Sequence, residues 1–151
     1  MYFKSGEDIW FSAWYFIEKG RPTSLIDFEC SYFFQGAGMR LLLNEKLQPR
    51  IEMKWPTRPT YYANVNKNAA LPNGHWFNLK IHYLLSKDSN GQIQLCLDDQ
   101  LILDHSGQTL PIDRAIYDRM EVGITANPKS QDTVLFVDDI KVAKHAKGIE
   151  K

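Results

Sequence analysis

One stretch of the sequence decides the fold, residues 74–111: GHWFNLKIHYLLSKDSNGQIQLCLDDQLILDHSGQTLP. Side chains in the segment 76–85 alternate between two sets, which is the period of a half-buried strand. The set that we expect to face the core is Phe77, Leu79, Ile81, Tyr83 and Leu85. A turn at 88–91 leads into a second alternating segment, 92–97, and a hairpin at 98–99 returns the chain along 101–103. Consecutive antiparallel strands of this kind indicate an all-β protein.

The rest of the chain repeats this pattern of short apolar stretches separated by turn residues. We expect further strands at 9–18, 24–33, 39–43, 50–55, 61–65, 120–125 and 133–143. The segment 111–119, PIDRAIYDR, has helical spacing but is short, and we interpret it as a connecting turn. A total of about ten strands exceeds a small barrel and predicts a two-sheet antiparallel β-sandwich.

Length and composition limit the other classes of protein. The 151 residues have room for one domain, which we place at 1–144, followed by a polar tail at 145–151. The formal net charge is zero, so a nucleic-acid partner is not expected. Apolar runs fall far short of the roughly 20 residues that span a bilayer. The N-terminus MYFKSGEDIW lacks the shape of a signal peptide. The sequence leaves the compartment open: we expect an extracellular or periplasmic protein if an upstream signal was removed, and a cytoplasmic one otherwise.

Cys30 and Cys96 are far apart in the sequence, and we expect two free thiols. A disulfide requires Cα atoms within about 7 Å, which the sequence leaves open. The sequence holds no Cys-x-x-Cys pair and no Cys/His cluster, so a structural zinc site is not expected.

The order of these features resembles the concanavalin A-like lectin and glucanase superfamily. In that superfamily a Trp opens a long strand, a Ser-Asp-x-x-Gly turn follows, and a short hairpin has an Asp-Gly or Asn-Gly tip. The segments 121–127 (EVGITAN) and 134–142 (VLFVDDIKV) resemble its closing strands, and 6–17 (GEDIWFSAWYFI) resembles its opening strand. The pattern is similar to polysaccharide lyases of the heparin-lyase and glucuronan-lyase type and to laminin G-like domains. The resemblance implies a concanavalin A-like jelly roll that binds a polysaccharide or another glycan.

Two rows of polar side chains are the candidate ligand-binding residues. The first row is Arg50, Glu52 and Lys54, and the second is Trp76, Asn78, Lys80 and His82. If both strands lie in one sheet, they form a surface that offers hydrogen bonds, an aromatic platform for a sugar ring and cations for uronic acids. The alternative interpretation is that both rows are the solvated side of a sheet.

We expect a carbohydrate-binding module without catalytic activity, because the Glu-x-Asp-x-x-Glu pattern of the retaining glucanases is absent from the sequence. Two alternatives stay open. One is a polysaccharide lyase acting on a glycan that contains uronic acid, with His82 and Tyr61 (or Tyr62) as candidate base and Arg50 neutralising the uronate. The other is a structural or adhesion module that contacts protein.

Asp138 is the candidate metal ligand. In a regular strand it shares a face with Val134, Phe136, Ile140 and Val142, where an unpaired carboxylate costs several kcal/mol. Proteins of the superfamily often hold a structural calcium ion near the first and last strands. By that resemblance, Asp138 with Glu7 is a candidate calcium site. No other cofactor is expected.

Overall fold

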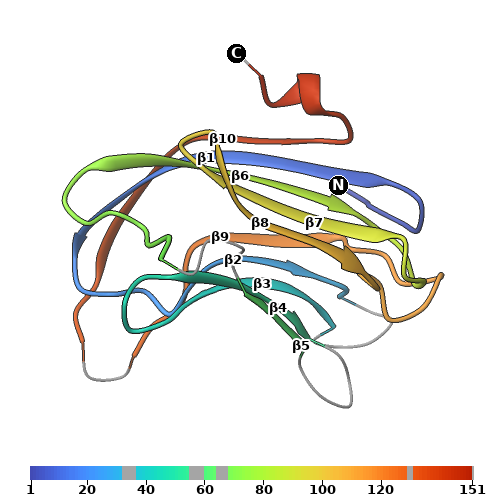
Figure 1. The fold of residues 1–151 in the computed structure, drawn as a ribbon, viewed down its shortest axis with the longest axis horizontal. Helices are drawn as coiled ribbons and strands as arrows, with labels where there is room; N and C mark the ends of the chain where they lie inside the picture. Colours follow the sequence, from blue (N-terminus) through green and yellow to red (C-terminus); the bar gives the residue numbers. More distant parts are fainter. Residues whose placement is uncertain (32–36, 55–59, 64–67, 129–130, 151) are drawn as a thin grey trace.

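The computed structural model describes residues 1–31, 37–54, 60–63, 68–128 and 131–150, which form ten strands in two stacked antiparallel sheets (Figure 1). The β1 sheet has the order β10-β1-β6-β7-β8 and the β3 sheet has the order β5-β4-β3-β2-β9. The strands of the β1 sheet are β10 (Val134–Ala143), β1 (Asp8–Lys19), β6 (Trp76–Leu84), β7 (Gly91–Leu97) and β8 (Gln100–Gly107). Those of the β3 sheet are β5 (Thr60–Ala63), β4 (Pro49–Lys54), β3 (Gly38–Leu43), β2 (Ser24–Glu29) and β9 (Arg119–Ala126). The predicted two-sheet sandwich is confirmed.

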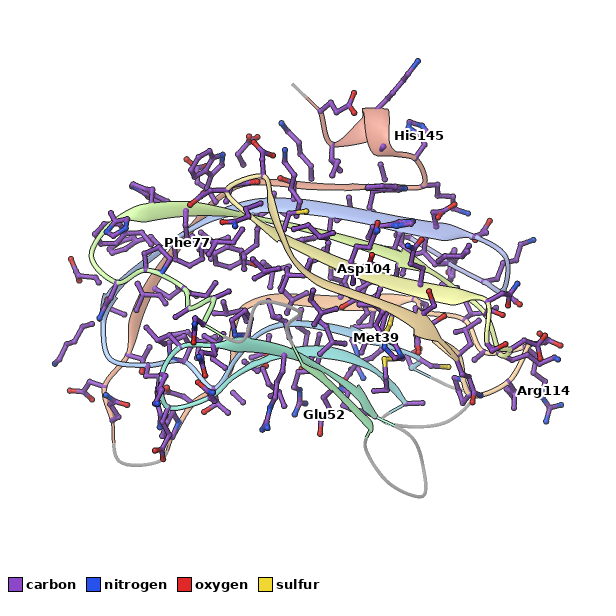
Figure 2. All side chains as sticks on the ribbon, viewed as in Figure 1. Met39, Glu52, Phe77, Asp104, Arg114 and His145 are labelled. Carbon is purple, nitrogen blue, oxygen red and sulfur yellow. The ribbon has the colours of Figure 1, made fainter. Side chains whose placement is uncertain are left out.

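The hydrophobic core lies between the two sheets. All five side chains that were expected on the inner face of β6 are buried, with Phe77 fully so. Met39 and Phe77 come from facing sheets, whereas Glu52 lies on the outer side of the β3 sheet (Figure 2). Phe28 of β2 meets Tyr83 of β6 edge-on, with ring centroids 5.7 Å apart. Because one face of each strand meets this core, the alternation of apolar residues marks the strands well.

The strand boundaries differ from the prediction in a few places. β8 extends to Gly107, beyond the predicted end at Leu103, and β2 ends at Glu29. The predicted strand ends at Phe33, Trp55 and Val65 lie outside the described residues. The segment 111–119 forms turns and a bridge, and no helix, as expected.

β10 contains a bulge that changes which side chains face the core. Asp138 lies opposite Trp14, but Lys141 lies opposite Ser12, so two residues of β10 stand against Ala13. Asp139 has a φ of 49°, which fits the irregular backbone of a bulge. Asp138 is exposed, and its carboxylate accepts a hydrogen bond from the Asp139 N–H at 2.8 Å. The prediction that Asp138 lies on a buried apolar face is therefore wrong.

The C-terminal segment folds back over the β1 sheet (Figure 1). It contains a single 3-10 turn, η1 (Ala146–Gly148), followed by Ile149, which is only 6% exposed. The described part of the predicted polar tail is thus packed against the sandwich. Among the described residues, no helix is both long and apolar enough to cross a membrane. Cys30 and Cys96 are free thiols, as expected.

Candidate functional site

The two predicted rows of polar residues lie on different sheets. Arg50, Glu52 and Lys54 belong to β4 of the β3 sheet, whereas the row that begins at Trp76 belongs to β6 of the β1 sheet. Both rows face outward, so the hydrophobic core separates them. The expectation of one combined surface is wrong, because strands 50–55 and 76–85 do not share a sheet. Each outer face is therefore a separate candidate site.

The outer face of the β3 sheet carries a network of alternating charges. Asp27 of β2 accepts hydrogen bonds from Arg40 Nε at 2.8 and 3.0 Å and lies 3.4 Å from Lys54 Nζ. The network continues outward through three further pairs. These are Lys54–Glu29 at 2.5 Å, Arg119–Glu29 at 2.8 Å and Arg40–Glu52 at 3.8 Å. Because cross-strand register places these residues side by side, every charge in the network has an opposite neighbour.

The pKa shifts in this network follow from the charges. Burial alone would raise the pKa of Glu29, but the hydrogen bond from Lys54 and the charges of Lys54, Arg119 and Arg40 together lower it. Burial would lower the pKa of Arg40, and the hydrogen bond to Asp27 raises it instead. Both shifts favour the charged forms. Arg40, Lys54 and Arg119 are therefore engaged by neighbouring carboxylates, which limits what these three cations offer to an anionic ligand.

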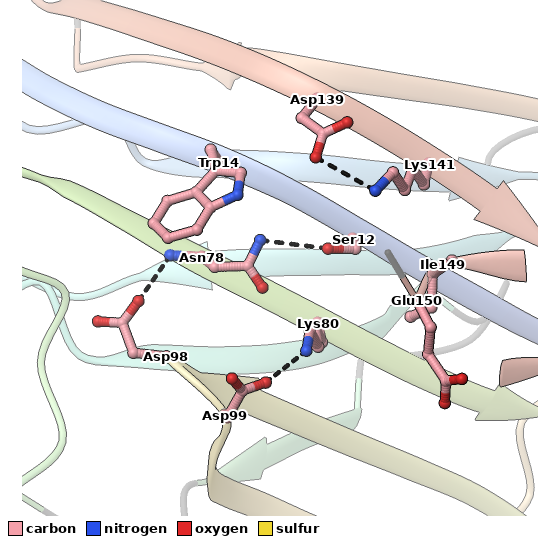
Figure 3. Close-up of a pocket in the computed structure, with 10 residues that line it drawn as sticks. All are labelled: Ser12, Trp14, Asn78, Lys80, Asp98, Asp99, Asp139, Lys141, Ile149 and Glu150. Carbon is pink, nitrogen blue, oxygen red and sulfur yellow. Dashed lines mark hydrogen bonds and ion pairs between the residues drawn. The ribbon is translucent and has the colours of Figure 1, made fainter. Parts of the chain in front are cut away.

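The outer face of the β1 sheet holds a pocket of about 390 Å³ (Figure 3). Its lining comes from β1, β6, β10, the β7–β8 turn and the C-terminal segment. The lining residues are Ser12, Trp14, Asn78, Lys80, Asp98, Asp99, Asp139, Lys141, Ile149 and Glu150. The pocket thus joins an indole, an amide, a hydroxyl and several charged groups, which can bind a polar ligand of moderate size.

Asn78 and Ser12 are the most buried polar residues in the lining, at 7% and 5% exposed. The side-chain NH₂ of Asn78 donates to Ser12 Oγ at 3.2 Å and to the Ala13 carbonyl at 3.1 Å. Its Oδ1 is buried and accepts no hydrogen bond from the described residues. In Figure 3 this oxygen points away from Ser12. A buried carbonyl oxygen without a donor costs about 1–3 kcal/mol, so a donor brought to it would be stabilised.

The β7–β8 turn supplies two of the acids. Asp98 and Asp99 have φ values of 47° and 67°, a left-handed pair that closes a two-residue hairpin, and Asp tolerates it better than most residues. Asp98 accepts a hydrogen bond from the Asn78 N–H at 2.8 Å, and Asp99 pairs with Lys80. On the opposite side of the pocket Lys141 pairs with Asp139 at 3.2 Å. Both lysines of the lining are thereby held by carboxylates.

An aromatic patch lies on the same face of the β1 sheet as the pocket. It consists of Trp14, Phe16, Trp76 and Phe136. Phe16 contacts Trp76 and Phe136 with ring centroids 5.6 and 6.1 Å apart. Trp76 and Phe136 are 46% and 48% exposed, which is unusual for such large apolar side chains. The cross-strand register places Trp14 of the pocket next to Phe16 on the same face of β1.

His82 lies on this face but outside the pocket lining. Its Nε2 is 2.6 Å from Asp8 Oδ1, its Nδ1 is 3.3 Å from Gln94 Oε1, and its ring stacks on Trp10 at 4.0 Å. The predicted lyase group of His82, Tyr61 and Arg50 does not assemble, because Tyr61 and Arg50 belong to strands of the other sheet. That prediction is wrong for the same reason as the combined surface.

The proposed calcium ligands also lie apart. Asp138 is opposite Trp14, whereas Glu7 precedes the start of β1, about 20 Å away along the strand. Glu7 accepts a hydrogen bond from Lys144 at 2.6 Å, which lowers its pKa. No group of three or more metal-binding side chains occurs among the described residues. Calcium binding stays a prediction, although Asp138 and Glu7 cannot bind one ion together. The effect of a chelator on the melting temperature tests it.

Sequence reasoning found Asn78 and Lys80 of the pocket and missed the rest. The alternation of β1 places Ser12 and Trp14 on the face that leads away from the core, which is a signal that was available. Asp98 and Asp99 follow the sequence pattern of a hairpin turn, which gives no sign that they line a pocket. Nothing local indicates that Ile149 and Glu150 return to this face, because that contact joins the C-terminal segment to β1 and β6.

Comparisons with known proteins bear on the fold. No family model matches the chain, and no curated protein matches it. An endo-β-1,4-glucuronan lyase from the fungus Trichoderma reesei has a TM-score of 0.73 at 10% identity, over 97% of this chain and 72% of the lyase. Cellulose induced protein Cip1 has a TM-score of 0.65 at 16% identity, over 92% of this chain and 68% of Cip1. The carbohydrate-binding module CBM66 from Bacillus subtilis has a TM-score of 0.59 at 12% identity, over 91% of this chain and 75% of the module. The chain has the concanavalin A-like jelly-roll fold of these three solved structures.

Proposed function

We propose that the protein binds a glycan on the outer face of the β1 sheet and does not cleave it. The observation that carries this proposal is the aromatic patch beside the pocket. Trp14 belongs to both, so a sugar ring stacked on the patch has its hydroxyl groups within reach of the pocket. Sugars are bound by this combination, because their C–H faces pack on aromatic rings while their hydroxyls exchange hydrogen bonds.

Two further facts support the proposal. The solved structures with this fold include carbohydrate-binding and polysaccharide-cleaving proteins, as their names state. In addition, the residues that were candidates for lyase chemistry are divided between the two sheets, and His82 is held on both ring nitrogens. A β-elimination needs a base and a group that neutralises the uronate at one sugar, and these residues do not meet.

Retention on immobilised polysaccharides and a glycan array test the proposal. We expect binding to at least one glycan, with a loss of tenfold or more in Trp14→Ala and in Trp76→Ala. Tyr2→Ala is the matched control, since Tyr2 is an exposed aromatic, 66% exposed, outside the pocket and the patch. The proposal fails if no glycan binds, or if Tyr2→Ala weakens binding as much as the two tryptophan variants.

An assay for absorbance near 235 nm, where unsaturated uronate products absorb, tests the absence of cleavage. We expect no increase with alginate, glucuronan or heparin. An increase that depends on this protein would contradict the non-catalytic part of the proposal and leave the binding part standing.

A further inference from the structure

We propose, on the basis of the proposed function, that the pocket selects glycans without carboxylates and binds an amino sugar more tightly than its neutral counterpart. The first reason is charge. The lining contains two lysines, Lys80 and Lys141, and four acids, so its net charge is −2. This differs from the expectation that Lys80 serves a uronic acid.

The second reason is that the lysines are already engaged. Lys80 pairs with Asp99, and Lys141 pairs with Asp139. A uronate that took either lysine would leave the displaced Asp without its cation, in a pocket that is negative already. The lysine would exchange one carboxylate partner for another, so the binding free energy would gain little. The uronate and the displaced Asp would also repel each other.

The third reason is a surplus of hydrogen-bond acceptors. Asp98 and Glu150 take part in no ion pair among the described residues, and Asn78 Oδ1 is buried without a donor. Hydroxyl and ammonium groups can donate to these oxygens, and an ionised carboxylate cannot donate at all. The ammonium of a 2-amino sugar provides three hydrogen-bond donors for the unpaired acceptors. It also provides a positive charge, which is attracted by the net negative charge of the lining.

The expected discrimination can be estimated from Coulomb's law. A unit charge about 8 Å from two net negative charges, in a medium as polar as water, changes affinity by roughly fivefold. The affinity for an amino sugar should therefore be higher than that for a neutral sugar by this factor, and the affinity for a uronate should be lower by the same factor. Salt screens these interactions, so the differences narrow at high ionic strength.

Titration calorimetry with β-1,4-linked oligomers of glucosamine, glucose and mannuronate, all of one length, tests the inference. At low salt we expect glucosamine to bind most tightly and mannuronate most weakly, with steps of roughly fivefold that shrink in about 0.3 M salt. The double variant Asp98→Asn/Glu150→Gln should remove most of the difference. Asn at position 98 keeps the acceptor for the Asn78 N–H and tolerates the positive φ.

Glu45→Gln/Glu121→Gln is the control for total charge, because both acids are exposed and lie on the side of the β3 sheet. It should keep the full discrimination. Mannuronate binding most tightly, and losing that binding in Trp76→Ala, would overturn the inference and leave the glycan-binding function intact. Equal discrimination in the two double variants would also overturn it, and binding of none of the oligomers would overturn the inference, whereas the glycan array decides the proposed function.

Discussion

Asp27→Asn is expected to destabilise the protein without weakening glycan binding. The Asp27 side chain is 2% exposed and interacts with both Arg40 and Lys54 on the outer face of the β3 sheet. Asn has nearly the same shape, so the substitution removes the charge without opening a cavity. The consequence is that two cations lose their most buried carboxylate.

The size of the effect follows from the surroundings of the two cations. Removing one partner of a fully buried ion pair costs about 3–5 kcal/mol. Here Arg40 and Lys54 keep 28% and 14% exposure, and each retains a second carboxylate, Glu52 or Glu29. We therefore expect a loss of about 2 kcal/mol in the free energy of unfolding, or a decrease of about 4–8 °C in melting temperature for a domain of this size.

Thermal unfolding followed by circular dichroism measures the loss, and glycan retention on the same samples measures binding. Asp132→Asn is the control, because Asp132 pairs with Lys19 at 3.5 Å with 89% of its side chain exposed, and we expect no measurable change there. A melting temperature that decreases by less than 1 °C would refute a stabilising role for the network. Loss of glycan binding at unchanged stability would place the ligand on the β3 sheet instead.

Three further predictions concern stability and the thiols. Gly38→Ala should prevent folding or lower the melting temperature far more than Gly74→Ala. A Cβ at position 38 would lie 2.0 Å from a backbone oxygen of β2. A Cβ at position 74 would meet open space, and the only cost there is the unfavourable φ of 79°. The lowered pKa of Glu29 means that the stability its charge contributes is complete above its ordinary pKa of 4.5 and is lost as the pH falls through the lower folded value. Glu29→Gln should therefore flatten the acid side of a plot of melting temperature against pH, and an unchanged profile would contradict this. Cys96 should react slowly with a thiol reagent, since burial raises its pKa. The fully buried Cys30 should react only after unfolding, and rapid reaction of Cys30 in the folded protein would contradict its buried position.

The strands could be predicted from the sequence because each has one face in the core. The segment 76–85 alternates because every second side chain fills the space between the sheets, and turn residues end each run. The partners of the strands could not be predicted in the same way. β1 pairs with β6 and β10, and β2 pairs with β9, over separations that no local pattern records. The two polar rows were therefore predicted correctly as outward-facing and incorrectly as neighbours.

The prediction for Asp138 failed for a different physical reason. Counting every second residue back from Val142, which packs against the core, assumes a regular strand, but the bulge next to Asp139 shifts the phase between Asp138 and Lys141. In addition, Phe136 and Ile140 are about half exposed, so the apolar side chains near Asp138 do not mark the core face. Large apolar residues on an outer face make alternation misleading, and Phe136 belongs to the aromatic patch that we propose for the ligand.

The division of the polar residues between two faces limits what each face can do. On the β3 sheet Arg40 and Lys54 are held by carboxylates, and Asp27 at the centre of the network is almost fully buried. On the β1 sheet the imidazole of His82 is held by Asp8 and Gln94 and stacked on Trp10, so it has no nitrogen directed at a ligand. A lyase needs its base and its neutralising cation within reach of one sugar, and the candidates His82 and Arg50 lie on different sheets. Binding without cleavage needs no such pair of residues, because the aromatic patch is already exposed and the pocket already presents its acceptors.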